Sequence, residues 1–306
     1  MKFLTFARYA WLVLAYNIVV ILWGVFLRAS RSGDGCGQHW LTCHGEIIPS
    51  APQLETAIEF SHRITSALAF LAVLGLLVWA FRKFEKGNII RKTSLGAFVF
   101  IVTEALIGAG LVLTGNTAEN LTPTRPFWMA GHLINTFILL AFLSLTAWFA
   151  SGGKEFHLNS SPKALFLIAL ALLGILFVSL TGSIAALSNL LFPSESLVEG
   201  LSKDFSPTSH FLVRLRISHP IASIFISVYL IFFADWLKKQ SENAEKVAYW
   251  AKMLSILIIV QLFLGAITLL SLSPIIMQVT HLLFADLIWI SFILLTASFL
   301  AEKRIA

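Results

Sequence analysis

The stretch Glu59-Phe60-Ser61-His62-Arg63 opens an apolar run, Ile64–Phe81, that contains no charged residue. About 20 apolar residues are enough for a helix to cross a membrane. On such a helix Glu59 lies three residues before His62 and four before Arg63, so these side chains can meet on one face. Ionisable side chains at membrane depth are costly and indicate a functional site. The alternative is structural, with Glu59 and Arg63 in the polar interface and His62 in a local hydrogen bond.

The composition around this run is that of a polytopic membrane protein. The chain has 306 residues, of which 58% are hydrophobic and 12% charged, whereas an average soluble domain carries about 25% charged residues. We expect an all-α polytopic membrane protein with eight transmembrane helices, the first a retained span and not a signal peptide. The predicted spans are Tyr9–Leu27, Ala57–Phe81, Thr93–Leu113, Phe127–Phe149, Lys163–Ala185, Phe211–Leu237, Val247–Leu270 and Pro274–Leu300.

The distribution of Lys and Arg predicts the orientation of these spans. Most of the 22 Lys and Arg residues lie near the two termini and in the loops after the second, fourth and sixth spans. By the positive-inside rule we expect a multi-pass protein of the cell membrane with both termini in the cytoplasm. The segments 28–61 and 186–210 then lie on the outer, oxidising face. The net charge of +6 is not a nucleic-acid signal, because its distribution sets the topology. We expect contact with membrane lipid and not with nucleic acid.

The first outer loop, Ser32–Gly45, holds the only two cysteines of the chain, Cys36 and Cys43. An even number of cysteines on an oxidising face suggests a disulfide that closes a small loop. A redox-active dithiol remains open. So does a metal pair with the nearby His39 and His44, although the spacing matches no zinc pattern. The c-type haem attachment motif, C-x-x-C-H, is not present here.

The two halves of the chain resemble each other at an offset of 157 residues. Glu104–Ala109 in the third span is echoed by Gln261–Ala266 in the seventh, and Ser61-His62 is echoed by Ser218-His219. Each half has four spans, and an even number per repeat preserves orientation, so the halves relate by an axis along the membrane normal. We therefore expect two pseudo-symmetric four-helix bundles. The predicted bundles are residues 1–152 and 153–306.

Each predicted bundle contributes two histidines near the outer ends of its even-numbered spans. They are His62, His132, His219 and His281. All four should lie at one level, roughly 8–12 Å below the outer surface. Two neutral imidazoles that converge in a four-helix bundle are what a haem iron needs for axial ligation. We expect two haem sites, with a proton relay or another metal site as alternatives. The remaining histidines, in loops or at helix ends, are His39, His44, His157 and His210.

The surroundings of the first histidine differ between the halves. Glu59 lies three residues before His62, whereas Arg216 lies three residues before His219 and Pro220 follows it. A Glu at the edge of an apolar pocket can act as an acid or base, or hold an oxygen ligand. This difference predicts a catalytic first half and an electron-transferring second half. Pro220 lacks an N–H and is expected to kink the sixth span just after its histidine.

The loop and histidine motifs together resemble the haem A synthase family, over essentially the whole chain. The residues that carry the resemblance are Gly35-Cys36-Gly37, Trp40, Cys43-His44-Gly45, Pro49, Glu59–Arg63 and one His in each of the fourth, sixth and eighth spans. The resemblance implies eight spans in two pseudo-symmetric bundles. It also implies an oxidoreductase that converts haem O to haem A for cytochrome oxidase. A porphyrin methyl group is oxidised to a formyl group by successive hydroxylations.

The resemblance also implies roles for the two halves. The N-terminal half, residues 1–152, takes the substrate haem between His62 and His132, with Glu59 essential for catalysis. The C-terminal half, residues 153–306, holds a haem b, with His219 and His281 as the axial ligands of its iron.

Further residues and partners are implied in the same way. Cys36 and Cys43 would match an outer-loop disulfide of the family. Arg28 and Arg63 would be cofactor-binding, Arg28 as a partner of a haem propionate. Haem O synthase, the protohaem farnesyltransferase, is the expected partner, and the context is cytochrome oxidase assembly. The sequence leaves the oligomeric state open, a homo-oligomer included.

Two other functions fit parts of the same pattern. A di-haem b membrane cytochrome that only carries electrons would use the same four histidines. Such a carrier has no need of a carboxylate like Glu59 beside one haem, so this residue favours the enzyme. A haem or small-molecule transporter is the weakest alternative, because the polar groups gather at one face instead of at broken helices in mid-membrane.

Overall fold

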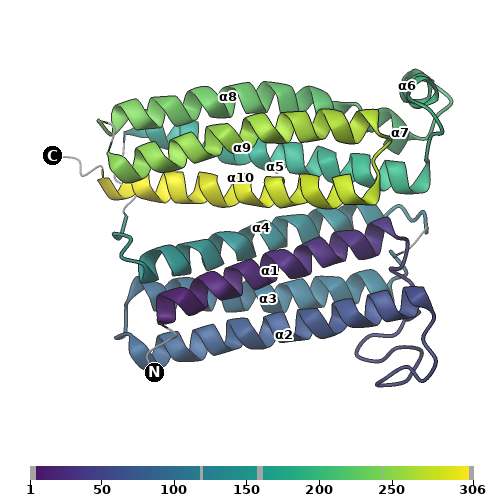
Figure 1. Cartoon of the computed structure of the whole chain (residues 1–306), viewed down its shortest axis with the longest axis horizontal. Coiled ribbons are helices and arrows are strands. Elements are labelled where there is room, and N and C mark those ends of the chain that lie inside the picture. Colours follow the sequence, from purple (N-terminus) through teal and green to yellow (C-terminus); the bar gives the residue numbers. More distant parts are fainter. Residues whose placement is uncertain (1–4, 118–119, 157–160, 243, 303–306) are drawn as a thin grey trace.

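The computed structural model describes residues 5–117, 120–156, 161–242 and 244–302, and these residues form helices without a β-strand (Figure 1). The helices are α1 (Phe6–Ala29), α2 (Leu54–Lys83), α3 (Ile89–Leu113), α4 (Arg125–Ala150), α5 (Pro162–Leu191), α6 (Leu197–Phe205), α7 (Phe211–Leu215), α8 (Ser218–Gln240), α9 (Glu245–Leu270) and α10 (Ile275–Glu302). Several begin at ordinary capping residues. Asn88 accepts a hydrogen bond from the N–H of Ile90 at the start of α3, and Ser161 accepts one from that of Ala164 at the start of α5.

Eight of the helical segments are long and apolar enough to cross a membrane, with α7 and α8 together forming the sixth. Each of them overlaps one predicted span. The prediction of an all-α polytopic membrane protein is therefore confirmed. The helices extend beyond the apolar runs; α2, for example, begins at Leu54, three residues before the predicted start.

The sixth span is broken before its histidine and not after it. Helix α7 ends at Leu215, and α8 begins at Ser218. Pro220 therefore lies in the first turn of α8, where a backbone N–H would have no partner within the helix. The predicted kink just after His219 is wrong, because the proline starts a new helix instead of interrupting an existing one.

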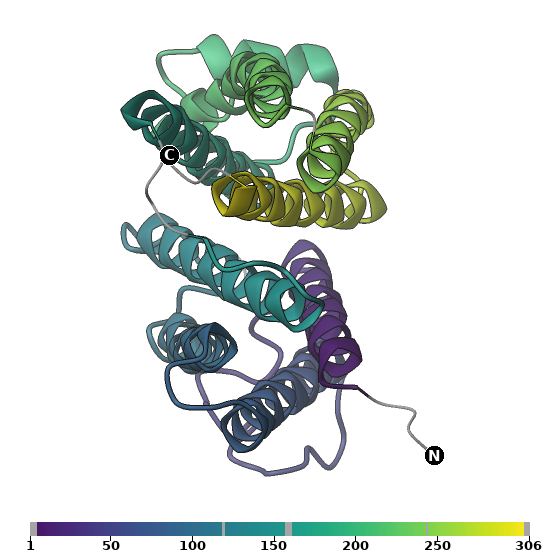
Figure 2. The same ribbon diagram turned by 90° about the vertical axis from the view of Figure 1, so that its left-hand side faces the viewer.

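The helices form two groups that lie side by side (Figure 2). Helices α1, α2, α3 and α4 pack against one another, and α5, α8, α9 and α10 form the other group. The two central helices are α4 and α10: 61% of the most apolar window of each is buried, against 17–28% in the other spans. At their contact the rings of Phe137 and Trp289 stack with centroids 4.9 Å apart, and the Trp289 indole donates a hydrogen bond to the Phe137 carbonyl.

The ends of the described chain and its longest loop lie at opposite ends of the molecule. Phe6, the first residue of α1, and Glu302, the last residue of α10, lie at the same end of the molecule, as an even number of spans requires. The long loop between α1 and α2 lies at the other end together with α6 and α7 (Figure 1). This second end, which we call the loop end, is the one that the sequence predicts to face outward.

Candidate functional site

All four predicted ligand histidines lie in the spans near the loop end. His62 follows Leu54 by eight residues, His132 follows Arg125 by seven, His219 follows Phe211 by eight and His281 follows Ile275 by six. Each is half-buried. The helix starts thus place the four side chains at similar depths, two in each group of helices.

His219 and His281 face each other in the C-terminal group. Their ring centroids are 6.2 Å apart and the ring planes are inclined by 85°. Two imidazoles that share one metal ion through bonds of about 2 Å have ring centroids roughly 6 Å apart. The pair therefore fits axial ligation of a haem iron.

The other side of the His219 ring already has hydrogen-bonding partners. Its Nδ1 atom lies 3.1 Å from the Val178 carbonyl oxygen and 3.4 Å from the Thr181 hydroxyl, both on α5. Ligand histidines usually donate their second ring N–H to such an acceptor, which orients the ring. These contacts leave Nε2 as the ligating atom.

Glycines of neighbouring helices leave room for three of the four rings. A Cβ atom at Gly24 would lie 2.9 Å from His62 Nε2, and one at Gly182 would lie 2.9 Å from His219 Cε1. A Cβ atom at Gly265 would lie 3.3 Å from His281 Cε1. Distances below about 3 Å are closer than non-bonded heavy atoms approach. The absence of side chains at Gly24 and Gly182 is therefore a condition for the present positions of the His62 and His219 rings.

The N-terminal group contains a polar network around His132. Glu104 of α3 has its Oε1 atom 3.5 Å from His132 Nδ1. The Asn135 amide donates to Glu104 Oε2 at 2.5 Å, and the Thr136 hydroxyl donates to Oε1. In the same group, His62 of α2 lies at a depth similar to that of His132 of α4. His132 thus has a half-buried carboxylate beside it.

Glu59 and Arg63 do meet, as their spacing predicts. The Arg63 guanidinium donates to Glu59 Oε1 at 2.5 and 3.2 Å. Glu59 is 4% exposed, and its Oε2 atom accepts a hydrogen bond from the Cys36 backbone N–H at 2.8 Å. Arg63 also donates to the carbonyl oxygens of His39 and Thr42, both at 2.7 Å. The Glu59–Arg63 pair therefore holds the loop between α1 and α2 against the first turns of α2.

The loop between α1 and α2 contains the predicted disulfide. Cys36 and Cys43 are bonded to each other and both are fully buried. His44 Nε2 lies 2.8 Å from the Gly35 carbonyl oxygen. Among the described residues no group of three His, Cys, Asp or Glu side chains could hold a metal ion, and His157 lies outside the described residues.

Arg28 lies where the two groups of helices meet at the loop end. It ends α1, and its Nη2 atom is 3.4 Å from Gln278 Oε1 on α10. Arg125 at the start of α4 is 3% exposed and interacts electrostatically with Arg28. Two guanidinium groups at this level suit carboxylate groups such as haem propionates. Of these two residues only Arg28 is predicted from the sequence, because Arg125 looks like an ordinary loop cation beside an apolar run.

Two carboxylates inside the spans were also missed. Glu104 lies within the predicted third span and Asp286 within the eighth. Asp286 is 1% exposed, and neither of its carboxylate oxygens has a hydrogen-bond partner among the described residues. The signal that could have found both is the cost of an ionisable side chain in a membrane span.

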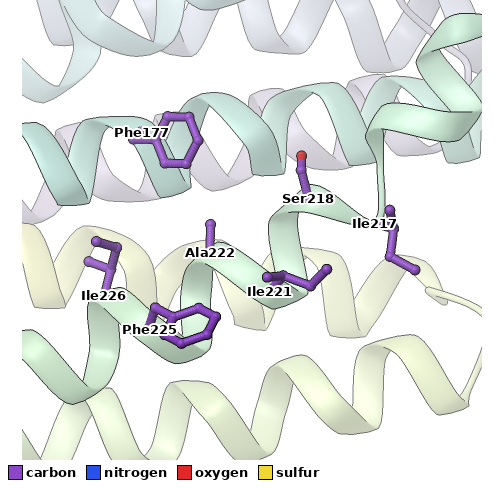
Figure 3. A pocket seen from close by; sticks show the side chains of 7 residues that line it. All are labelled: Phe177, Ile217, Ser218, Ile221, Ala222, Phe225 and Ile226. Atoms are coloured by element: carbon purple, nitrogen blue, oxygen red, sulfur yellow. The ribbon is translucent and has the colours of Figure 1, made fainter.

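An apolar pocket of about 480 Å³ lies between α5 and the start of α8. Phe177 of α5 faces it from one side, and residues from Ile217 to Ile226 line it from the other (Figure 3). Phe177 adjoins Val178 in the chain, and Val178 contacts His219. The pocket therefore provides apolar surface on the His219 side of this group.

Comparison with known proteins gives a match over nearly the whole chain. Residues 7–293 match the family COX15-CtaA, described as cytochrome oxidase assembly protein. A protein of Thermus thermophilus named protoheme IX farnesyltransferase is 45% identical over 301 residues, which are 98% of this chain and 49% of that protein. The chain thus spans about half the length of this relative.

Proteins named heme A synthase match over most of both chains. The one from Alkalihalophilus pseudofirmus is 27% identical over 262 residues, 82% of each chain. The one from Bacillus cereus is 27% identical over 274 residues, 87% of this chain and 84% of the relative.

Proposed function

We propose that this chain, which belongs to the COX15-CtaA family of cytochrome oxidase assembly proteins, is a haem A synthase. It would be an oxidoreductase that oxidises a methyl group of haem O to a formyl group by successive hydroxylations, giving haem A. The observation that carries the proposal is the pairing of four histidines, two per half at similar depth, in a chain whose relatives of matching length are named heme A synthase.

The activity in the name of the Thermus relative can belong to the half of that protein that this chain does not match. This chain matches only 49% of that protein, so the farnesyl transfer in its name need not belong to the matched part. Farnesyl transfer to protohaem gives haem O, the substrate proposed here. We therefore propose haem O synthase as the partner that supplies the substrate.

In the C-terminal half, His219 and His281 would hold a haem b between them. Their ring spacing of 6.2 Å supports this assignment. The bound haem would supply one-electron transfer. Val178 and Thr181 would keep the His219 ring in its ligating orientation.

In the N-terminal half, His62 and His132 would hold the substrate haem. Glu59 would act at its edge, and its contacts with Cys36 and Arg63 give it a fixed position beside His62. A carboxylate fixed in this way can orient or transfer a proton of a reacting oxygen. Arg28 at the loop end would bind a propionate, with Arg63 closing the mouth of the site through the loop carbonyls it contacts.

We also propose the orientation in the cell membrane. Both termini would lie in the cytoplasm, and the loop end, with the haem sites, would face outward. The excess of Lys and Arg near the opposite end supports this orientation. An oxidising outer face also suits the Cys36–Cys43 disulfide.

The proposal is tested by identifying the haems that the protein carries and makes. The full chain is purified from cells that supply haem O, and its haems are extracted and separated by chromatography, for wild type, Glu59→Gln and Glu55→Gln. Glu55 is an exposed carboxylate one turn earlier on α2, which makes it a matched control.

We expect haem A or a hydroxylated intermediate in wild type and in Glu55→Gln, but not in Glu59→Gln. If all three proteins carry haem b alone, at two bis-histidine sites, the chain is a di-haem electron carrier and the synthase proposal fails. A wild type without haem would point to transport.

A further inference from the structure

Glu104 and Gln261 occupy the same place in the two halves. They are 157 positions apart, which is the offset that relates the halves to each other. Glu104 on α3 lies against His132 of α4, and Gln261 on α9 lies against His281 of α10. Both halves therefore have a polar partner for their second histidine, but it is a carboxylate in the first half and an amide in the second.

His132 presents one side of its ring to Glu104 and the other side to open space. Its Nδ1 atom is buried, makes no hydrogen bond to a described residue and lies 3.5 Å from Glu104 Oε1. The side chain as a whole is nevertheless 41% exposed. The exposed surface of the side chain therefore belongs to atoms other than Nδ1.

The Glu104 carboxylate is held in place by donors of its own. Asn135 donates to Oε2 at 2.5 Å, and Thr136 donates to Oε1. The Thr103 hydroxyl in turn donates to Asn135 Oδ1 at 2.5 Å. Asn135 and Thr136 follow His132 by three and four residues on α4, so the network fixes the carboxylate relative to the helix that carries the histidine.

The second half has no such network. At the places that correspond to Asn135 and Thr136, an offset of 149 from His132 to His281, it has Phe284 and Ala285. Gln261 instead directs its Nε2 atom to His281 Nε2 at 3.2 Å and to the His281 carbonyl oxygen at 3.0 Å.

We propose that Glu104 is a positioning residue for the substrate haem. Its carboxylate accepts a hydrogen bond from Nδ1–H of His132, which fixes the tautomer that leaves Nε2 free for the iron of haem O. The inference rests on the proposed function. Partners of this kind orient ligand histidines and raise their basicity. The two atoms are 3.5 Å apart, and hydrogen bonds of this kind often tighten only when substrate binds.

The decisive variant is Glu104→Gln, which gives the first half the amide of the second. The full-length protein is loaded with haem O, conversion is followed by haem extraction, and the midpoint potentials of the bound haems are measured by redox titration. We expect conversion to fall about 10- to 100-fold. The midpoint potential of the N-terminal haem should rise, because a neutral amide makes His132 a weaker electron donor, and the potential of the C-terminal haem should stay the same.

Two further variants separate positioning from a general effect on folding. Ser144→Ala removes another buried hydroxyl of α4, which lies three turns beyond His132 and donates to the Leu140 carbonyl oxygen. This variant should change neither conversion nor potential. Gln261→Glu puts a carboxylate beside the His281 ring and should lower the potential of the C-terminal haem alone. It also keeps the inference testable if Glu104→Gln does not fold.

The outcomes distinguish this inference from the proposed function. Wild-type conversion and an unchanged N-terminal potential in Glu104→Gln would overturn the role of Glu104, and so would an unchanged C-terminal potential in Gln261→Glu. If wild type binds two haems but converts no haem O, the synthase proposal fails, while a potential shift confined to one haem still supports the contact. A wild type that binds no haem overturns both.

Discussion

Glu59 and Arg216 lie at corresponding positions in the two halves, three residues before the first histidine of each, and carry opposite charges. Glu59 accepts a hydrogen bond from the Cys36 backbone and thereby holds the loop between α1 and α2. Arg216 pairs with Asp204 and donates to the Gly200 carbonyl oxygen at 2.8 Å, which holds α6. Both therefore anchor a segment of the loop end. The difference in charge between Glu59 and Arg216 therefore does not by itself assign catalysis to one half.

A larger difference between the halves lies around the second histidine of each, His132 and His281. His132 has the network of Glu104, Asn135 and Thr136, whereas His281 has Gln261 alone among the corresponding positions. The neighbouring glycines differ as well. A Cβ atom at Gly265 would approach His281 to 3.3 Å, but one at the corresponding Gly108 would meet nothing within 4 Å. The repeat has thus preserved the helices and the ligand positions, while the first half is more polar and more open.

The largest effect is expected from removing one histidine in each half. His62→Ala should keep haem b and lose haem O conversion by about 1,000-fold or more, because the substrate is no longer held at its reacting position. His219→Ala should lose haem b itself. Haem content and haem O conversion of the two purified variants, measured side by side, check this. Loss of the same haem in both variants would contradict separate roles for the two halves.

The glycine contacts allow a sharper test with a single methyl group. Gly24→Ala should lower conversion about 100-fold, because the added Cβ must displace the His62 ring and a shift of about 1 Å can cost that much. Gly108→Ala in the same half should leave conversion unchanged, since open space surrounds that position. Initial rates at saturating haem O measure both. Equal losses in the two variants would show that helix packing, and not the ring position, is responsible.

A smaller effect is expected from the disulfide. Replacing Cys36 and Cys43 together by Ser should loosen the loop and weaken the hydrogen bond from the Cys36 N–H to Glu59. A hydrogen bond to a charged group contributes about 1.5–3 kcal/mol, so conversion should fall about tenfold. Faster hydrogen exchange in residues 36–43, with haem b content unchanged, would accompany it. Unchanged exchange would mean that Arg63 holds the loop alone.

Arg216→Gln should have the smallest effect on conversion. Removing one partner of a mostly buried ion pair costs about 3–5 kcal/mol locally, so α6 should detach and exchange its amide hydrogens faster. Conversion at the N-terminal site should stay at the wild-type level. Hydrogen exchange of residues 197–205 and the rate of haem A formation measure the two quantities. A loss of conversion as large as in Glu59→Gln would remove the functional distinction between these two residues.

The sequence by itself determined the eight spans, the repeat and the four histidines. Hydropathy and helical periodicity are properties of the chain taken in order, because each span must satisfy its own backbone hydrogen bonds in lipid. The depth of His62 and the meeting of Glu59 with Arg63 follow from the same local geometry. The disulfide also followed from the sequence, because the chain has only two cysteines and they lie close together.

Only the tertiary structure decided which side chains meet across helices. The contact of Glu104 with His132, the approach of Gly24 to His62 and the break before Ser218 depend on how each helix is rotated about its axis and how closely its neighbours pack. Spans such as α3 have apolar residues on most of their surface, so their hydrophobic pattern does not say which face turns inward. The packing of the helices within and between the two groups sets those rotations, and with them the surroundings of each histidine.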